Sequence, residues 1–441
     1  MFRGTLNMYV ERIVFSILLL GSATAAAIPQ IQNWQTDQGA GVYFVETHEL
    51  PIVDIRVVFD AGGGRDGNKP GLALLTNSLL ALGAAGLDAD QISRGFENLG
   101  AKFGSGAEND FASVNLRVVQ DAGQLETAIN NLKRVITSPD FPDAAFERQK
   151  SRTLIGIRQK QQSPADLAND AFFAAIYGEH PYAVPVEGTE ASLQQISVED
   201  IRKFHKKYYV AANAIVAIVG DLDRAGAEQL VNELLADLPA GNKAKSMPEV
   251  QPLTESKTIW IDYPSTQTHI LVGQPGIRRD DPDLFPLYVG NHVLGGGGMV
   301  SRLFEEIREK RGLSYSAYSY FIPKRRAGPF IAGLQTRTDQ ADAALELLLE
   351  ELRDYVRDGP DETELEASRE NLTGGFPLRI DSNGDIMNYL AMIGFYGLPL
   401  DYLDTYSSKI MSVTIADVKK AFQQKLSPDR MIRVLVGPVN K

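Results

Sequence analysis

The chain has 441 residues, of which 44% are hydrophobic, and it contains no cysteine. Disulfides, a thiol nucleophile and a thiolate metal site are therefore excluded, and stability must come from the core. The length favours two domains, because single cores rarely extend beyond about 250 to 300 residues. The formal net charge of −12 makes nucleic acid and anionic membrane surfaces poor partners.

Residues 1–27 are typical of a secretory signal peptide. Arg3 and Arg12 precede an apolar run at 13–20, and small residues follow as far as Ala27. A transmembrane span needs about 20 apolar residues, which is more than this run supplies. We expect cleavage near Ala25 or Ala27 and a periplasmic mature protein with no stable membrane anchor. An uncleaved anchor is the alternative.

The region 28–237 is predicted to form one α+β domain. Alternation of apolar and polar residues predicts strands, and helical spacing predicts helices. The expected strands cover 41–46, 52–59, 111–119 and 213–219. The expected helices begin at Pro70 and then cover 90–99, 123–137, 142–161, 164–177 and 197–209. Because strands and helices come in groups and do not alternate strictly, the class is α+β.

A polar, breaker-rich segment at 238–255 is predicted to link this domain to a second one at 256–441. The second domain repeats the order of the first. Its expected elements are strands at 257–262 and 267–273, helices at 283–294 and 299–311, strands at 315–323 and 329–336, and then helices. Each half ends with a helix, an apolar strand and a glycine turn, at 213–221 and at 430–438. This repetition predicts a duplicated domain.

Six short stretches resemble one protein family. They lie at 60–65 (DAGGGR), 71–73 (GLA), 180–182 (HPY), 188–189 (GT), 204–209 (FHKKYY) and 301–316 (SRLFEEIREKRGLSYS). In them the chain resembles the pitrilysin, insulysin and mitochondrial-processing-peptidase superfamily of inverted zincins, in its bacterial two-domain branch. The resemblance covers almost all of the mature chain. It implies two homologous domains, each a mainly antiparallel sheet packed against helices, that form a clam-like half-shell around a chamber.

Active members of this superfamily bind zinc through His-x-x-Glu-His on a helix and a further glutamate. The resemblance places Leu74, Asn77 and Ser78 at the three motif positions and Gly156 at the position of the further glutamate. Catalytic zinc needs three protein ligands, and the motif glutamate must accept a proton from the bound water. Leucine and glycine offer no side-chain ligand, serine is a poor one, and asparagine is not a base. The resemblance therefore implies a chain with no catalytic residue and no metal.

A replacement metal site has little support in the sequence. The chain has five histidines, and the two nearest, His269 and His292, lie 23 residues apart. No local pair of ligands exists, although assembly from distant loops stays open as an alternative. We expect His180 and His205 to have loop and surface roles.

The second half contains a pair of residues that would serve a zinc site, although the first half has no zinc ligands. In two-domain relatives an arginine and a tyrosine at the positions of Arg308 and Tyr315 reach the substrate peptide at the zinc site. A guanidinium is a fixed fork of donors, and a phenol can donate to a carbonyl that gains negative charge. From the residues alone, the favoured interpretation of Arg308 is a solvated residue beside the apolar stripe between Met299 and Ile307, and it is the resemblance that favours a substrate-binding role.

The resemblance thus implies a catalytically inactive, substrate-binding subunit of a heterodimeric periplasmic zinc metallopeptidase. Zinc is expected in a paralogous partner subunit, and the substrate is expected to be a peptide. A non-enzymatic scaffold or peptide-binding protein, similar to core subunits of respiratory complexes, is the alternative. A third possibility is an autonomous enzyme with an unfamiliar site. Homodimerisation is left open.

Overall fold

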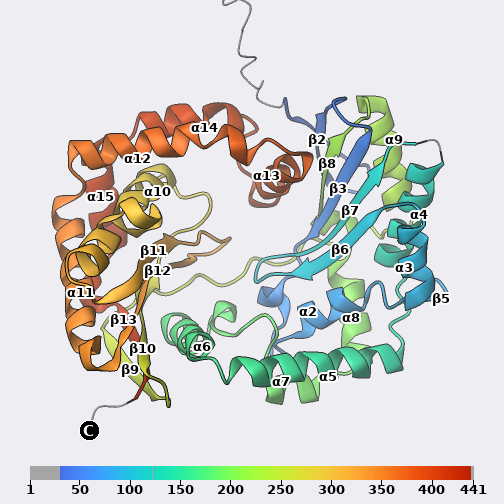
Figure 1. Cartoon of the computed structure of the whole chain (residues 1–441). Helices are drawn as coiled ribbons and strands as arrows, with labels where there is room; N and C mark the ends of the chain where they lie inside the picture. The colour runs from blue at the N-terminus through green and yellow to red at the C-terminus, as the bar shows by residue number, and fades with distance from the viewer. Residues whose placement is uncertain (1–29, 122, 439–441) are drawn as a thin grey trace, which may run out of the picture.

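A computed structural model describes residues 30–121 and 123–438. The expected signal peptide and its cleavage site lie outside these residues. The described residues form two halves that lie side by side, each built on one large β-sheet (Figure 1). No helix in the described part is long and apolar enough to cross a membrane.

The two large sheets have the same topology. The strands of the first sheet are β1 (Gln32–Gln35), β2 (Gly41–Glu46), β3 (Ile52–Phe59), β6 (Lys102–Ala107), β7 (Ala112–Val119) and β8 (Ala214–Gly220). Those of the second are β9 (Lys257–Asp262), β10 (Gln267–Pro275), β11 (Ser314–Phe321), β12 (Pro329–Arg337) and β13 (Ile432–Gly437). The order β2-β8-β3-β7-β6 in one sheet matches β9-β13-β10-β12-β11 in the other. In both, the first pair is parallel and the remaining pairs are antiparallel. The predicted α+β class with two homologous, mainly antiparallel domains is confirmed.

Helices follow the same repeated order. Those of the first half are α2 (Leu72–Leu79), α3 (Ala89–Glu97), α4 (Gln124–Thr137), α5 (Asp143–Lys160), α6 (Pro164–Tyr177), α7 (Glu190–Gln195), α8 (Val198–Tyr208) and α9 (Arg224–Leu235). Those of the second are α10 (Leu284–Asn291), α11 (Ala341–Asp358), α12 (Glu362–Gly374), α13 (Asn383–Tyr396), α14 (Tyr402–Met411) and α15 (Ile415–Lys425). The helix expected at 299–311 is instead a short 3₁₀ turn, η5 (Gly298–Val300), and a π-helical segment, η6 (Phe304–Glu309).

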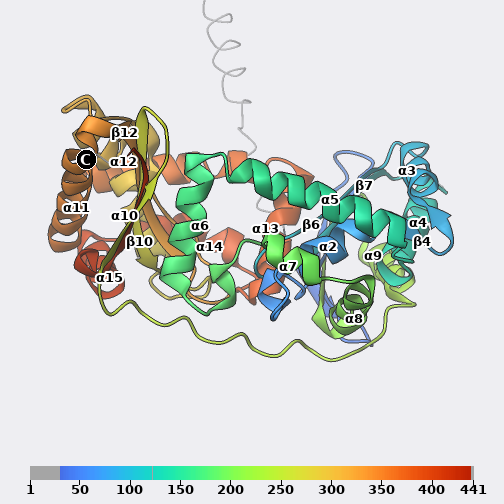
Figure 2. The same cartoon turned by 90° about the horizontal axis from the view of Figure 1, so that it is seen from below.

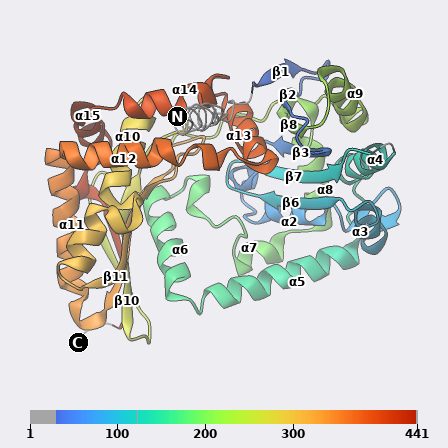
Figure 3. The same cartoon turned by 45° about the horizontal axis from the view of Figure 1, so that its top comes forward.

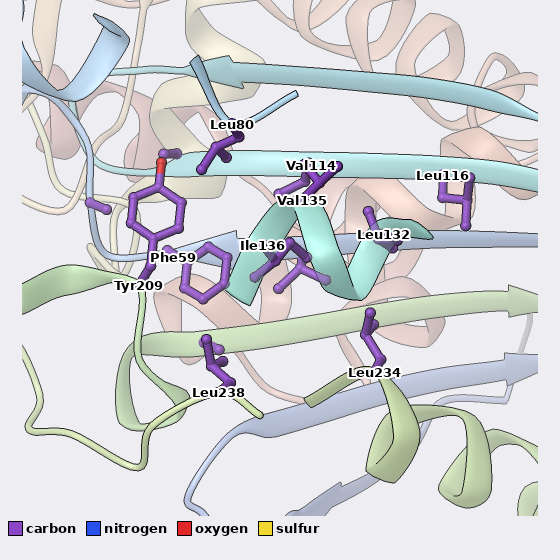
Figure 4. Close-up of a cluster of buried hydrophobic side chains, with 14 of the residues drawn as sticks. Phe59, Leu80, Val114, Leu116, Leu132, Val135, Ile136, Tyr209, Leu234 and Leu238 are labelled. Atoms are coloured by element: carbon purple, nitrogen blue, oxygen red, sulfur yellow. The ribbon is translucent and has the colours of Figure 1, made fainter. Parts of the chain in front are cut away.

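One face of each sheet packs against helices of its own half. In the first half, Phe59 and Val114 of the strands contact a buried cluster from α4 and α9 (Figure 4). The helical members of that cluster drawn in the figure are Leu132, Val135, Ile136 and Leu234. Burial of such side chains contributes about 1.5 to 3 kcal/mol each. The cluster on this face is larger than the cluster on the opposite face of the same sheet.

The opposite face of each sheet is covered by a helix from the other half. Strand β8 shows why a cover is needed: Val216 and Ile218 face the core of their own half, while Ala217 and Val219 face the other way and are equally buried. Side chains alternate along a strand, so an apolar run has two faces to bury. Helix α13 of the second half covers that outer face of the first sheet, and α6 of the first half covers the second sheet (Figures 1 and 3).

Glycines allow both exchanged helices to approach closely. A Cβ atom at Gly273 of β10 would lie 2.8 Å from the ring of Phe172 on α6. A Cβ atom at Gly394 of α13 would lie 2.5 Å from the ring of Tyr43 and 2.6 Å from Ile215. The missing side chains therefore set the distance between each helix and the sheet of the other half.

A buried carboxylate also joins the halves. Asp110, in the turn between β6 and β7, accepts hydrogen bonds from the hydroxyls of Tyr182 and Tyr396 and from the backbone N–H of Arg325. Tyr396 ends α13, and Arg325 lies in the β11–β12 connection, so both belong to the second half. Carboxylates that accept charge-assisted bonds in a buried site are costly to remove.

The connection between the halves runs along one side of the molecule. Residues 239–256 contain no helix or strand and form a long extended path (Figure 2). Arg326 holds this path by donating from Nε to the carbonyl of Met247 at 2.9 Å and from a terminal nitrogen to the hydroxyl of Ser246 at 2.9 Å.

Replacing Phe172 by alanine tests whether the exchanged helices make the halves one cooperative unit. Phe172 is fully buried, so the change should lower the free energy of unfolding by about 3 to 5 kcal/mol. Trp34 in the first sheet and Trp260 in the second are the two tryptophans of the chain, and single-tryptophan variants report on each sheet separately. In urea unfolding followed by fluorescence, both reporters should shift together. Ile155→Ala, at an exposed position, is the control; a shift of the Trp260 reporter alone would contradict cooperative unfolding.

Candidate functional site

The helix that carries the altered zinc motif has a well-built N-terminus. Asp66 is buried, and its carboxylate accepts hydrogen bonds from the backbone N–H groups of Gly71 at 2.8 Å and Ala73 at 2.7 Å. These bonds satisfy donors that the first turn of α2 leaves free. Desolvation raises the pKa of Asp66 to about 7, and the backbone hydrogen bonds oppose that rise. Gly71 has a φ of 98°, a left-handed conformation that favours glycine.

The motif positions on α2 are occupied by side chains that bind their own protein. Asn77 is 1% exposed, and its amide donates to the carbonyl of Ser113 and to the hydroxyl of Tyr209, each at 3.2 Å. The side-chain oxygen of Asn77 is buried without a hydrogen-bond partner among the described residues. Ser78 donates to the carbonyl of Leu74 at 2.7 Å, one turn back on the same helix. These polar groups are therefore directed at the backbone and at Tyr209.

Gly156 lies on α5, which packs against α2. A Cβ atom at this position would have no heavy atom within 4 Å. The structure thus brings together the two helices that carry Leu74, Asn77, Ser78 and Gly156, and it leaves open space where the third protein ligand would project. Two apolar positions, a hydroxyl and an amide do not fit a catalytic zinc ion, which takes imidazole and carboxylate ligands.

The histidines are dispersed among separate elements. Within residues 30–121 and 123–438, no group of three or more His, Cys, Asp or Glu side chains is arranged to hold a metal ion. His180 precedes the 3₁₀ turn η2 (Pro181–Ala183) and accepts a hydrogen bond from the N–H of Tyr182, in line with a loop role. The surface role expected for His205 is wrong, because its ring donates to the carbonyl of Ile136 at 2.9 Å and stacks on Tyr209.

Arg308 and Tyr315 meet in the second half. The guanidinium carbon of Arg308 lies 4.7 Å from the ring centre of Tyr315 and 4.5 Å from that of Phe304, so it is held between two aromatic faces. Tyr315 is 83% exposed. The nearest carboxylate of Arg308 is that of Glu309, at 3.7 Å, and among the described residues no acceptor takes a hydrogen bond from its side chain. The donors of Arg308 are therefore oriented but unused.

The backbone around this pair is irregular. Arg308 lies in the π-helical segment η6, and the register between β11 and β12 shifts between Ser314 and Ala317. Both π-helical segments and β-bulges occur often beside functional sites, where they redirect side chains. Here the shift covers Tyr315, which projects into solvent although it belongs to a strand.

Comparison with known proteins identifies the family. Residues 42–190 match the protein family described as Insulinase (Peptidase family M16). Residues 195–372 match the family described as Peptidase M16 inactive domain. A solved structure from Pseudomonas fluorescens, described as a peptidase M16 inactive domain, is 40% identical and has a TM-score of 0.90. The match covers 93% of this chain and 98% of that one. This chain belongs to the peptidase M16 family.

Other relatives of this M16 chain are named either as proteases or as a non-peptidase homologue. A protein named as the non-peptidase homologue YmxG of Helicobacter pylori is 27% identical over 91% of this chain and 93% of its own length. An uncharacterized zinc protease of Streptomyces coelicolor is 26% identical over 82% of this chain and 79% of its own. The solved structure of a Helicobacter pylori protease, 18% identical with a TM-score of 0.86 over 93% of this chain and 100% of that one, shares the fold. Together with the altered motif, the match to the non-peptidase homologue and to the M16 inactive domain makes the chain an inactive member of the family.

His205 makes stability depend on pH. Burial lowers the pKa of His205 from 6.5 to about 4. Between these values the unfolded chain binds a proton that the folded protein does not, so the free energy of unfolding falls as pH falls from 6.5 towards 4. The loss should reach up to about 3 kcal/mol at pH 4. Urea unfolding at pH 7 and pH 4 should show a smaller loss for His205→Gln, which can still donate to Ile136. Equal losses in both proteins would contradict this assignment.

Proposed function

We propose that this M16 chain is the catalytically inactive, substrate-binding subunit of a heterodimeric zinc metallopeptidase in the periplasm. It contributes Arg308 and Tyr315 to a site whose zinc is held by a paralogous partner subunit. The observation that carries the proposal is the contrast between the halves. On α2 the amide of Asn77 and the hydroxyl of Ser78 are hydrogen-bonded within the protein, whereas among the described residues no acceptor takes a hydrogen bond from the side chain of Arg308, and Tyr315 is 83% exposed.

The chemistry of peptide hydrolysis suits such a division. A metal-activated water attacks from one side of the scissile bond, and fixed donors on the other side stabilise the carbonyl oxygen as it becomes negative. The guanidinium of Arg308 lies over the rings of Phe304 and Tyr315, and these contacts restrict its orientation before a substrate binds. The phenol of Tyr315 is a second donor beside it. When present in the partner, zinc would supply the activated water, and this chain would bind and orient the peptide.

Exposed apolar side chains near this pair support a protein partner. Met299 and Val300, in the turn before η6, are 76% and 78% exposed, and Tyr315 is 83% exposed. Large apolar side chains exposed together on a soluble protein usually mark a contact surface. Relatives of this chain include proteins named uncharacterized zinc proteases and one named a non-peptidase homologue.

Periplasmic location is supported by the sequence of residues 1–27, which is typical of a secretory signal peptide. The partner should carry His-x-x-Glu-His on the helix that corresponds to α2. The neighbouring reading frame is the first place to search for it.

Variants of the assembled complex test the proposal. Arg308→Ala and Tyr315→Phe should each lower kcat for peptide cleavage by about 10²- to 10³-fold, the usual cost of removing a donor that acts in the transition state. Assembly with the partner, followed by size-exclusion chromatography, should be unchanged. Arg311→Ala is the matched control, because Arg311 lies on the same segment but pairs with Glu306. Full activity of both test variants would instead favour a scaffold role.

A further inference from the structure

The second half contains a cavity that the proposed composite site does not use. Its volume is about 750 Å³, within the range of about 300 to 1,000 Å³ typical of ligand sites. It lies among α10, α13, α14 and the end of β11, and the π-helical segment η4 (His292–Gly296) forms part of its wall. Neither Arg308 nor Tyr315 lines it.

Aromatic rings form most of the apolar wall. They are Phe285, Tyr288, Tyr320, Phe321, Tyr389, Tyr402 and Tyr406. Neighbouring rings are 6.0 to 6.5 Å apart, as between Phe285 and Tyr406 at 6.0 Å and between Tyr389 and Tyr402 at 6.5 Å. Such walls accept an aromatic or bulky apolar group by edge and face contacts.

Among the polar residues of the lining, which include Asn291, His292 and Asn371, two are arginines. Arg379 donates to the hydroxyl of Tyr288 at 2.6 Å and to that of Tyr406 at 3.4 Å. The Nε atom of Arg279 is buried and has no hydrogen-bond partner among the described residues. Neither arginine has a carboxylate within 4 Å in the described part of the chain, whereas the adjacent Arg278 is paired with Asp280 at 2.6 Å.

The charge of the lining is unusual for this protein. No aspartate or glutamate is among the described residues that line the cavity, although the chain carries 56 acidic against 44 basic residues. Two guanidinium groups without counter-ions, facing an aromatic cavity, favour a ligand that brings its own negative charge. A carboxylate fits best, because its two oxygens match the fork of a guanidinium.

We propose that this cavity binds the free C-terminal carboxylate of a peptide whose last residue is aromatic or apolar. Arg379 and Arg279 bind the carboxylate, and the rings hold the terminal side chain. The shared chemistry, an apolar body with a carboxylate, also describes a fatty acid; the choice of a peptide rests on the proposed function. Strand β11 supports that choice, because it carries Tyr315 at one end and Tyr320, a cavity residue, five positions on. This separation is about 17 Å, the length of five extended residues.

Binding to the isolated mature chain tests the proposal without a partner subunit. The probes are a fluorescein-labelled hexapeptide that ends in Leu-Phe with a free carboxylate, the same peptide with a C-terminal amide, and sodium laurate as competitor. By fluorescence anisotropy the amide should bind at least about tenfold more weakly than the acid, since charged hydrogen bonds are lost. Laurate should not displace the peptide at equal concentration.

Variants locate the binding. Arg379→Gln and Arg279→Gln should each weaken binding of the acid about tenfold and leave the amide unchanged, and Arg379→Lys should restore part of the affinity. Arg430→Gln, at an exposed position outside the cavity, is the control. Thermal unfolding of each variant establishes that it is folded, and the comparison of acid with amide in the unaltered protein needs no variant.

Equal binding of acid and amide, no binding of either, or displacement of the peptide by laurate would overturn the proposal. These outcomes are independent of the composite site, because they involve no partner and no zinc. Conversely, loss of the role proposed for Arg308 and Tyr315 would leave a carboxylate-specific peptide site standing.

Discussion

The structure depends on the exchange of two helices between halves of the same topology. Each large sheet is apolar on both faces, and its own half supplies helices for one face. Helix α6 covers the second sheet and α13 covers the first. Neither half can bury its sheet alone, so the halves are bound in one arrangement. That arrangement fixes the position of α2 and α5 relative to η6 and β11, which carry the two parts of the family's chemistry.

Helix α2 and the pair Arg308 and Tyr315 are under different physical constraints. Leu72, Leu75 and Leu79 of α2 are buried in the core of the first half, so the helix must persist whether or not it binds metal. The ligand positions beside them can change without loss of the fold. Tyr315 is 83% exposed and contributes little to packing, and the side chain of Arg308 is 30% exposed beside it. Their stacked arrangement, with no side-chain hydrogen bond from Arg308 to a described residue, is therefore better explained by binding than by stability.

The sequence predicted much of this fold, and the failures have physical causes. Alternating residues located β2 and β3, but β6 was missed because two glycines in KFGSGA remove the strand signal. Helical spacing predicted α6 at 164–177 but could not show which sheet the helix covers, and the general prediction of helices after residue 336 did not locate α13. The resemblance located the altered motif and Arg308, whereas the contact of Asn77 with Tyr209 joins residues 132 positions apart and leaves no local pattern. The aromatic cavity was also invisible, because its aromatic residues come from four separate elements, α10, β11, α13 and α14.

The most direct test of the account is a joint measurement of zinc content and peptide cleavage on the purified mature chain alone. Elemental analysis should find no stoichiometric zinc, and a broad peptide mixture should remain uncut. Leu74, Asn77, Ser78 and Gly156 leave zinc without ligands and the water without a base. Stoichiometric zinc together with cleavage that a chelator abolishes would contradict the account.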